Sequence, residues 1–430
     1  MNTNSFLRAD EPTRRAFLGG MAKGLFGLSA LPVLGSRAIA GSDNLTPATA
    51  RNVIYLYMSG GMSHVDTFDL KPGNDVQGPT ESLRTNADGV LVSSHFQSLA
   101  KQMDKVCVIN SMKSTQGAHS QGRYYAHTGY ELRGTIQHPT MGAWLSHLAG
   151  GLNPTLPNHV EIGGGQYTAT AGFLGPKHAP LPIGDPAAGL QNSTRNDSVD
   201  AKTFERRLAR MRKMNEEFAR KHGEKGVSGY SDMYDEALRL MTSRDLAAFD
   251  ITQEPQALRD AYGDSTLGQG ALLARRLVEH GVRFVEVVSG GWDTHNDNFD
   301  ELEDLVPNLD RALGTLLADL DSRGMLEETL VVLTTEFGRT PTIVTDRMGR
   351  NHFPKAYSSL LAGGGIRGGT TWGKTDETGS NVIENPVTVP DFNATIAHAL
   401  GLPLKDEIYS PSGRPFTVAD KGVPVTEIFA

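Results

Sequence analysis

The sequence predicts an α/β fold with a mostly parallel sheet that helices cover on both faces. The apolar run at residues 52–58, NVIYLYM, is typical of a strand buried on both faces. Further short apolar runs alternate with amphipathic helical segments along most of the chain, and this alternation favours parallel strand pairing. Polar, glycine-rich segments follow several of these runs, as in the active sites at the carboxyl edge of open α/β sheets.

The expected elements follow in chain order, and each rests on its local composition. Strands are expected where apolar and β-branched residues cluster, at 52–58, 105–110, 159–162, 283–288, 329–335 and 356–362. Helices are expected at 119–128, which Gly129 closes, and at 141–148, 267–280, 298–322 and 391–400. Residues 165–197 are rich in Gly, Pro, Ala and Asn and are expected to form a loop. Charged amphipathic helices at 200–222 and 232–249 lie within residues of about 199–263, which we expect to be a helical insertion on the core.

The first 40 residues are expected to be a twin-arginine signal peptide rather than part of the fold. Arg14 and Arg15 precede a weakly apolar stretch at 24–34, and the small residues of Ala38-Ile39-Ala40 suit cleavage. The alternative is a disordered basic N-terminus. The signal predicts the twin-arginine export machinery as a partner and a periplasmic or secreted location, and residues 41–430 remain as one α/β domain.

Charge and cysteine content exclude several classes of protein. The formal net charge is −8 and no basic patch is present, so nucleic acid is not an expected partner. No other apolar run reaches the ~20 residues of a membrane span, so no stable span is expected after cleavage. The single cysteine, Cys107, lies in a predicted strand and allows no internal disulfide.

Two distant segments predict parts of one metal site. Asp293 and His295 follow the strand at 283–288, two positions apart, so both side chains can face one ion. Glu336 follows the strand at 329–335, and His352 lies in a downstream loop. Carboxylate and imidazole groups suit Zn²⁺, Mn²⁺ or a similar divalent ion. The alternatives are a helix cap for Asp293, a solvent-facing His295, and a surface ion pair of Glu336 with Arg339.

Two further segments contribute candidates. Asp66 lies in the glycine-rich segment after the first strand and suits a metal ligand, although an Asx turn explains it almost as well. His119 opens a predicted helix that also carries Arg123, and helix N-termini favour anions.

The segments GGMSHVDTFD at 60–69 and TEFGRTP at 335–341 resemble a family of exported bacterial proteins of unknown function within the alkaline phosphatase/sulfatase superfamily. The resemblance covers essentially the whole chain after residue 40. Where the superfamily has Thr-Ser-Asp-His-Gly or Thr-Ser-Asp-Asn-Gly, this chain has Thr334-Thr335-Glu336-Phe337-Gly338, so Glu336 replaces a metal-binding Asp and Phe337 replaces a ligand. His119 stands where sulfatases carry Cys or Ser, so no formylglycine can form there. The spacing from Arg123 to Thr128-Gly129 matches the sulfatase pattern.

The resemblance implies an alkaline phosphatase-like core and a metal-dependent hydrolase of phosphate- or sulfate-type esters. A divalent ion (Zn, Mn, Ca or Mg) would polarise a small-molecule or glycan ester. We expect His119 to be the nucleophile, general base or a further ligand, and Arg123 or Arg339 to stabilise the anionic transition state. The alternatives are a non-catalytic metal-binding or secretion-associated protein, and a phosphoglycerol or glycan-modifying transferase. The expected ligands are Asp66, Asp293, His295, Glu336 and His352.

Overall fold

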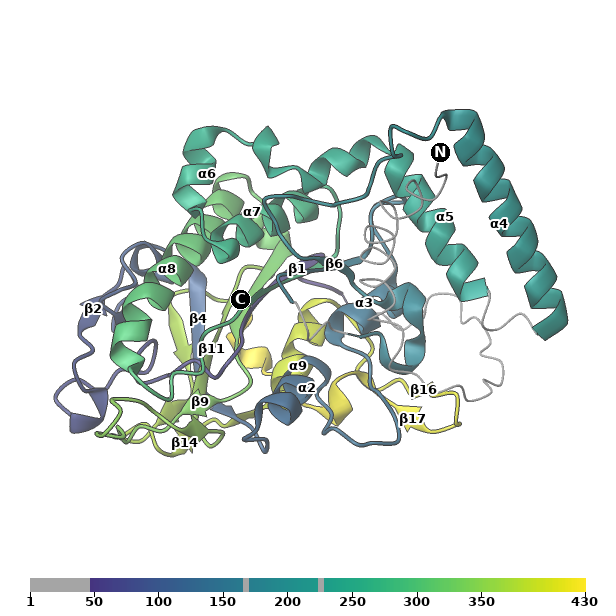
Figure 1. Cartoon of the computed structure of the whole chain (residues 1–430). Helices are drawn as coiled ribbons and strands as arrows, with labels where there is room; N and C mark the ends of the chain where they lie inside the picture. Colours follow the sequence, from purple (N-terminus) through teal and green to yellow (C-terminus); the bar gives the residue numbers. More distant parts are fainter. Residues whose placement is uncertain (1–46, 165–169, 223–227) are drawn as a thin grey trace.

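In the computed structural model, which describes residues 47–164, 170–222 and 228–430, one large sheet lies between two layers of helices (Figure 1). The described part of this sheet has nine strands in the order β12-β4-β11-β8-β1-β7-β5-β6, with β15 also paired to β4. The strands are β1 (Asn52–Met58), β4 (Val106–Lys113), β5 (His159–Ile162), β6 (Leu181–Ile183), β7 (Phe284–Ser289), β8 (Thr329–Thr334), β11 (Tyr357–Ala362), β12 (Thr370–Trp372) and β15 (Val387–Thr388). The predicted signal peptide at 1–40 lies outside the described residues.

The sheet is mostly parallel, as the sequence predicted. The central strand β1 pairs in parallel with β7 on one side and with β8 on the other. Among these nine strands only β11 runs in the opposite direction, antiparallel to both β4 and β8. The carboxyl ends of β1, β7 and β8 therefore meet at one edge, and β11 begins at that same edge.

Alternating residues of the strands form two cores, one on each face of the sheet. In β1, Ile54, Leu56 and Met58 join one core, while Tyr55 and Tyr57 join the other. The first core lies under α6 (Gln256–Tyr262), α7 (Thr266–Glu279) and α8 (Asn298–Ser322); the second lies under α2 (His119–Thr128), α3 (Met141–Ala149) and α9 (Val389–Ala399). Burial on both faces explains why the strands are almost continuously apolar.

Short two-stranded sheets decorate the edges of the core. The pair that matters for the site is β9 (Gly338–Arg339) with β10 (His352–Phe353), in which His352 is opposite Arg339. The other pairs are β2 (Ser82–Arg84) with β3 (Leu91–Ser93), β13 (Lys374–Thr375) with β14 (Val382–Glu384), and β16 (Ile408–Tyr409) with β17 (Pro415–Phe416).

The predicted core strands and helices are present, with ends shifted by a few residues, and two other predictions were wrong. The expected loop at 165–197 contains the edge strand β6. Its three residues, Leu181–Ile183, include a proline and show no strong strand pattern in the sequence. Residues 165–169 lie outside the described part. The helix expected at 232–249 is α5 (Ser228–Thr242), followed by a 3₁₀ helix at Arg244–Phe249. The helix stops because the Ser243 side chain accepts the Asp245 N–H and starts a new turn.

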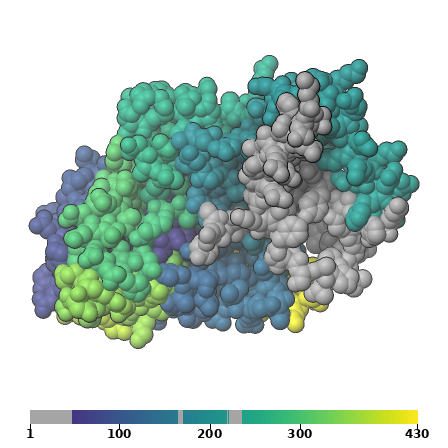
Figure 2. Space-filling model, viewed as in Figure 1, coloured from purple at the N-terminus to yellow at the C-terminus, as the bar shows by residue number. Residues whose placement is uncertain are grey.

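The segment predicted as an insertion is helical and is fixed to the core by its second half. The helix α4 (Ala201–His222) lies beside α5, and together they form a lobe at one end of the molecule (Figure 2). Leu240, Phe249 and Ile251 are buried in the first core, and the 3₁₀ segments that carry Phe249 and Ile251 contact α7. The division into a domain and an insertion stays a prediction. In the described part of the chain, no helix is both long enough and apolar enough to cross a membrane.

Candidate metal centre

The candidate site lies at the carboxyl edge of the sheet, where β1, β7 and β8 end. Asp293 follows β7 after Trp292, whose side chain is buried and whose backbone N–H donates to the Ser59 carbonyl at 3.3 Å. His119 is the first residue of α2, and His352 reaches the site from β10. The parallel strands, the start of α2 and the β9–β10 pair together bring three distant segments to one place.

Four side chains converge at this edge. His119 Nε2 lies 3.1 Å from Asp293 Oδ2. His352 Nε2 and His295 Nε2 lie 3.3 Å and 3.2 Å from Asp293 Oδ1, and the two imidazole nitrogens are 3.0 Å apart. Ligand atoms of His119, Asp293 and His352 all lie within 4.8 Å of one another.

The hydrogen bonds on the far side of two imidazoles turn bare nitrogens toward this point. His352 Nδ1 lies 2.9 Å from the Gly117 carbonyl, which only accepts, so Nδ1 carries the proton and neutral His352 has its lone pair on Nε2. His119 Nδ1 lies 2.8 Å from Glu336 Oε1, so Nδ1 carries the proton and neutral His119 has its lone pair on Nε2. Two imidazole lone pairs and a carboxylate thus face one another, and a cation relieves the mutual repulsion.

The donor set fits a divalent ion. His119 Nε2 is buried and makes no hydrogen bond of acceptable geometry with any described residue, despite its closeness to Asp293. Ligand bonds of ~2.0–2.1 Å in a tetrahedron place neighbouring donor atoms about 3.3 Å apart. Asp293 lies at about this spacing from both imidazoles, with Oδ2 3.1 Å from His119 Nε2 and Oδ1 3.3 Å from His352 Nε2, and ligand atoms of all three residues lie within 4.8 Å of one another. Mixed imidazole and carboxylate donors suit Zn²⁺ or Mn²⁺ better than Ca²⁺.

The charges around the cluster favour an ionised carboxylate. Burial opposes ionisation of Asp293, but the hydrogen bond and charge of Arg339 and the nearby His119 outweigh it and lower the pKa of Asp293 to about 2. Burial and Arg339 lower the pKa of His295, which favours its neutral form. The hydrogen bond to Glu336 raises the pKa of His119 despite its partial burial. The site therefore offers a carboxylate and at least one neutral imidazole near neutral pH.

Glu336 lies behind His119 and does not face the metal position. We expected a ligand, but its side chain is fully buried, and its oxygens accept hydrogen bonds from His119, the Gly60 N–H at 2.9 Å and the Tyr57 hydroxyl at 2.9 Å. Burial opposes its ionisation, but these hydrogen bonds, that of His119 foremost, lower the pKa of Glu336. The sequence located Glu336 at the site, and its tertiary contacts make it a hydrogen-bond partner of a ligand.

Arg339 also lies behind the cluster. We expected it to stabilise a substrate anion, but its side chain has no exposed surface. It donates to the carbonyls of Gly60, Gly61 and Arg350 and to Asp293 Oδ1. These contacts hold Asp293 in place and leave Arg339 no access to a substrate.

Asp66 is not brought to the cluster. We expected a ligand, but Asp66 forms a fully buried bidentate ion pair with Arg350, at 2.7 Å and 2.8 Å. Its oxygens also accept from Ser63 at 2.6 Å and from Asn298 at 3.1 Å. The pair ties the loop after β1 to the loop before β10, so we remove Asp66 from the proposed ligands.

Arg123 is the one predicted cationic side chain that remains at the site. It lies one helical turn after His119 on α2, and its Nη2 donates to the Ser59 hydroxyl at 2.7 Å, at the end of β1. Gly122 lets α2 approach this closely, because a Cβ there would lie 3.1 Å from both Glu336 and Phe337 side-chain atoms. Phe337 is buried, and its ring lies against the imidazoles of His119 and His352, with centroids 5.1 Å and 4.6 Å away.

Sequence reasoning missed two residues that hold the site together. Tyr57 is the last inward-facing residue of β1 on the α2 side, and its hydroxyl reaches Glu336. Gly60 has a φ of +132°, and a Cβ there would lie 2.6 Å from the Trp292 carbonyl carbon. The sequence features that could have identified these two residues are a tyrosine near the carboxyl end of a buried strand and the Gly60-Gly61 pair one residue after the strand ends.

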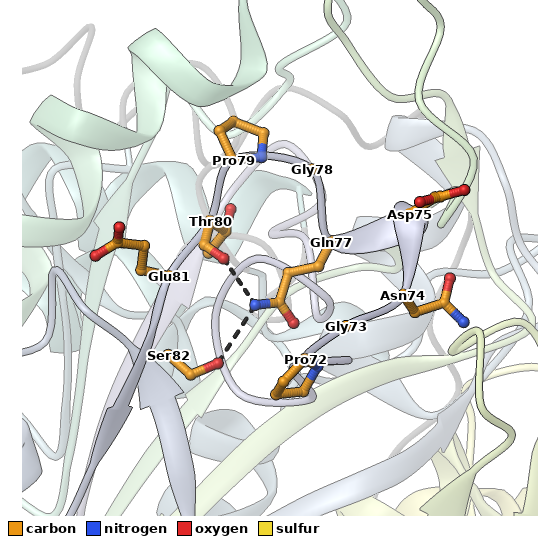
Figure 3. Close-up of a pocket in the computed structure, with 10 residues that line it drawn as sticks. All are labelled: Pro72, Gly73, Asn74, Asp75, Gln77, Gly78, Pro79, Thr80, Glu81 and Ser82. Atoms are coloured by element: carbon orange, nitrogen blue, oxygen red, sulfur yellow. Dashed lines mark hydrogen bonds between the residues drawn. The ribbon is translucent and has the colours of Figure 1, made fainter.

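A separate hollow of about 690 Å³ lies in the loop after β1, and its residues surround Gln77 (Figure 3). The Gln77 amide donates to the Thr80 carbonyl at 2.7 Å and to the Ser82 hydroxyl at 3.3 Å, and its oxygen accepts from the Lys71 N–H. Gln77 is therefore used to hold the loop itself, and none of the hollow's lining residues belongs to the metal cluster.

Comparison with solved structures gives distant likenesses. A sulfatase, PsFucS1 from Pseudoalteromonas sp., is 14% identical with a TM-score of 0.40, and the match covers 87% of this chain and 73% of the sulfatase. An alkaline phosphatase superfamily protein from Vibrio parahaemolyticus is 10% identical with a TM-score of 0.38, covering 97% of this chain and 79% of its own. A mutant of the alkaline phosphatase PafA is 10% identical with a TM-score of 0.43, covering 90% of this chain and 100% of its own.

A search of curated proteins found no match. The model of the family described as "Protein of unknown function (DUF1501)" matches residues 50–429, which is almost the whole described chain and includes every residue of the metal cluster. The match agrees with the family that the segments at 60–69 and 335–341 resemble. The chain therefore belongs to the DUF1501 family.

Proposed function

We propose that this protein is an exported metal-dependent hydrolase of phosphate- or sulfate-type esters, with His119, Asp293 and His352 as metal ligands and His295 beside them. One observation carries the proposal: the buried Nε2 of His119 has no aligned hydrogen-bond partner among the described residues, and it lies within 4.8 Å of ligand atoms of the Asp293 carboxylate and the His352 imidazole. Three protein ligands with room for a further one are typical of catalytic zinc sites, whereas structural sites are closed.

A bound divalent ion would polarise an ester oxygen and lower the pKa of an attacking water. The residues of this chain supply the rest. Asp293 is held ionised by Arg339, and its side chain is 47% exposed, so the site opens to solvent on that side. His295 is held mainly neutral and lies next to the ligands, so it is placed to take a proton from the water. Arg123, on the same face of α2 as His119, is the proposed contact for the ester anion.

A single ion suits this arrangement better than a pair of ions. Phe337 stands where the resemblance places a second ligand, and its buried ring covers one side of His119 and His352. A buried phenyl group offers no lone pair to a second cation, and its removal from water favours the present packing.

The test begins with metal content. The purified protein is dialysed against chelator and titrated with Zn²⁺ and Mn²⁺, and we expect one equivalent to bind. The His119→Ala, Asp293→Asn and His352→Ala variants should each bind more weakly. The loaded protein is then assayed with aryl phosphate, phosphodiester and sulfate esters. Tight stoichiometric binding without turnover of any ester would refute the hydrolase.

The second candidate is a non-catalytic metal-binding or secretion-associated protein. The observation that favours it is the identity of residue 119, because the position where sulfatases carry Cys or Ser holds an imidazole whose Nδ1 is already engaged by Glu336. Transfer to a phosphoglycerol or glycan acceptor is tested in the same assays by product analysis. Export is proposed from the Arg14-Arg15 pattern, and with it a periplasmic or secreted location.

A further inference from the structure

A second network, beneath the ligands, determines how His119 is presented. Glu336 follows β8 directly, and its side chain has no exposed surface. Its Oε1 accepts from His119 Nδ1 at 2.8 Å and from the Gly60 N–H at 2.9 Å, while its Oε2 accepts from the Tyr57 hydroxyl at 2.9 Å. The Thr335 hydroxyl lies 3.1 Å from Oε2 and shares its one proton with the Met58 carbonyl. Three to four donors thus fill the acceptor sites of this carboxylate.

This occupancy decides between two roles for Glu336. A ligand needs a lone pair directed at the ion, and the described contacts use both oxygens of Glu336 for groups on other sides. His119 lies between Glu336 and the cluster, with Nδ1 on the Glu336 side and Nε2 on the Asp293 side. In many metal sites a carboxylate accepts a hydrogen bond from the ligating imidazole, which fixes the orientation of the ring and raises the basicity of the ligand.

The network is rigid because backbone constraints hold each partner. Gly60 adopts a φ of +132°, so its N–H donates to Glu336 while its carbonyl accepts from Arg339. That one residue therefore links the support of His119 to the support of Asp293. Gly122 lets α2 pack against the Glu336 side chain, which fixes the start of the helix and with it His119.

We infer that Glu336 is a positioning residue that fixes His119 in the tautomer with its proton on Nδ1, so that Nε2 is the metal-binding atom. The inference rests on the proposed metal centre but not on hydrolysis. It assigns Glu336 a role distinct from that of a ligand: its charge and its acceptor geometry act on the metal through His119.

Two variants separate positioning from ligation. In Glu336→Gln the amide oxygen can still accept from His119 and Gly60, while the amide NH₂ can donate to Tyr57 and Thr335. In Glu336→Leu no acceptor remains for His119. We expect Zn²⁺ affinity to fall in steps, with a loss of about 10-fold for Gln and up to about 100-fold for Leu. If Glu336 were a ligand, both variants would lose the same bond and the Gln variant would give no rescue.

The tautomer itself is read by ¹⁵N NMR of the histidine side chains in the zinc-free full-length protein, at a pH high enough for the His119 ring to be neutral, with His119 assigned by comparison with His119→Ala. We expect a protonated Nδ1 on His119 in the unsubstituted and Gln forms, and loss of this preference in the Leu form. Tyr57→Phe is the matched control, because it removes a donor to Oε2 and leaves the bond to His119. It should retain the tautomer.

Each outcome bears on one of the two proposals. A His119 proton on Nε2, or equal affinity losses in the Gln and Leu variants, overturns the positioning role. If the Leu variant fails to fold, the Gln variant and the NMR measurement still decide. A graded affinity loss with the expected tautomer, but no turnover of any ester by the zinc-loaded protein, supports the positioning role and refutes the hydrolase alone.

Discussion

Replacing Asp66 by Asn tests whether this residue is a structural ion-pair partner or a metal ligand. The Asp66 and Arg350 side chains are fully buried, and removing one charge leaves the other without its counter-charge. Breaking a buried ion pair costs ~3–5 kcal/mol. Arg350 keeps the carbonyls of Thr340, Pro341 and Val76 as acceptors, so we take the lower end, about 3 kcal/mol, which is about 10²-fold in the unfolding constant.

The assay is urea unfolding of the metal-free protein, followed by circular dichroism, together with the Zn²⁺ stoichiometry. We expect Asp66→Asn to lower the free energy of unfolding by about 3 kcal/mol and to bind one Zn²⁺ as before. Asp300→Asn, at an exposed position in the first turn of α8, is the control and should change stability little. Unchanged stability combined with lost zinc binding would refute the structural role and restore Asp66 as a ligand.

Three further outcomes are expected. Gly60→Ala should weaken zinc binding and lower stability, because a Cβ there meets the Trp292 backbone at 2.6 Å and the φ of +132° disfavours other residues. Gly73→Ala, with open space at its Cβ, controls for the cost of positive φ. Equal effects of the two substitutions would contradict the steric argument. Burial lowers the pKa of His159 to about 4, so the unfolded chain takes up a proton first as the pH falls. The free energy of unfolding should therefore decrease by up to about 3 kcal/mol between pH 6.5 and 4, and by less in His159→Leu. An equal dependence on pH in both proteins would argue against His159 as the source. The double change Arg14→Lys and Arg15→Lys should leave the precursor in the cytoplasm in a fractionation assay, whereas mature protein in the periplasm would indicate an ordinary secretory signal.

The sequence was sufficient for the fold class because the signals for it are local. A strand such as β1, buried on both faces, must be apolar nearly throughout, and helices such as α8 must carry an apolar stripe. The edge strand β6 was missed because three residues that include a proline carry no such pattern. The positions of His119, Asp293 and His352 were found for a related reason: each lies just beyond a recognisable element, and parallel topology brings such positions to one edge.

The roles of these residues depended on tertiary contacts. In sequence, Asp66, Glu336 and Asp293 are equivalent carboxylates in segments that follow strands. Only the folded chain places Arg350 against Asp66, gives Glu336 three firm hydrogen-bond donors, and leaves Asp293 partly exposed among imidazoles. A carboxylate becomes a ligand or a buried partner according to which donors and charges surround it. These partners of Asp66 and Glu336 come from segments more than 200 residues away, so the sequence alone determined where the site lies and the tertiary structure decided which side chains face it.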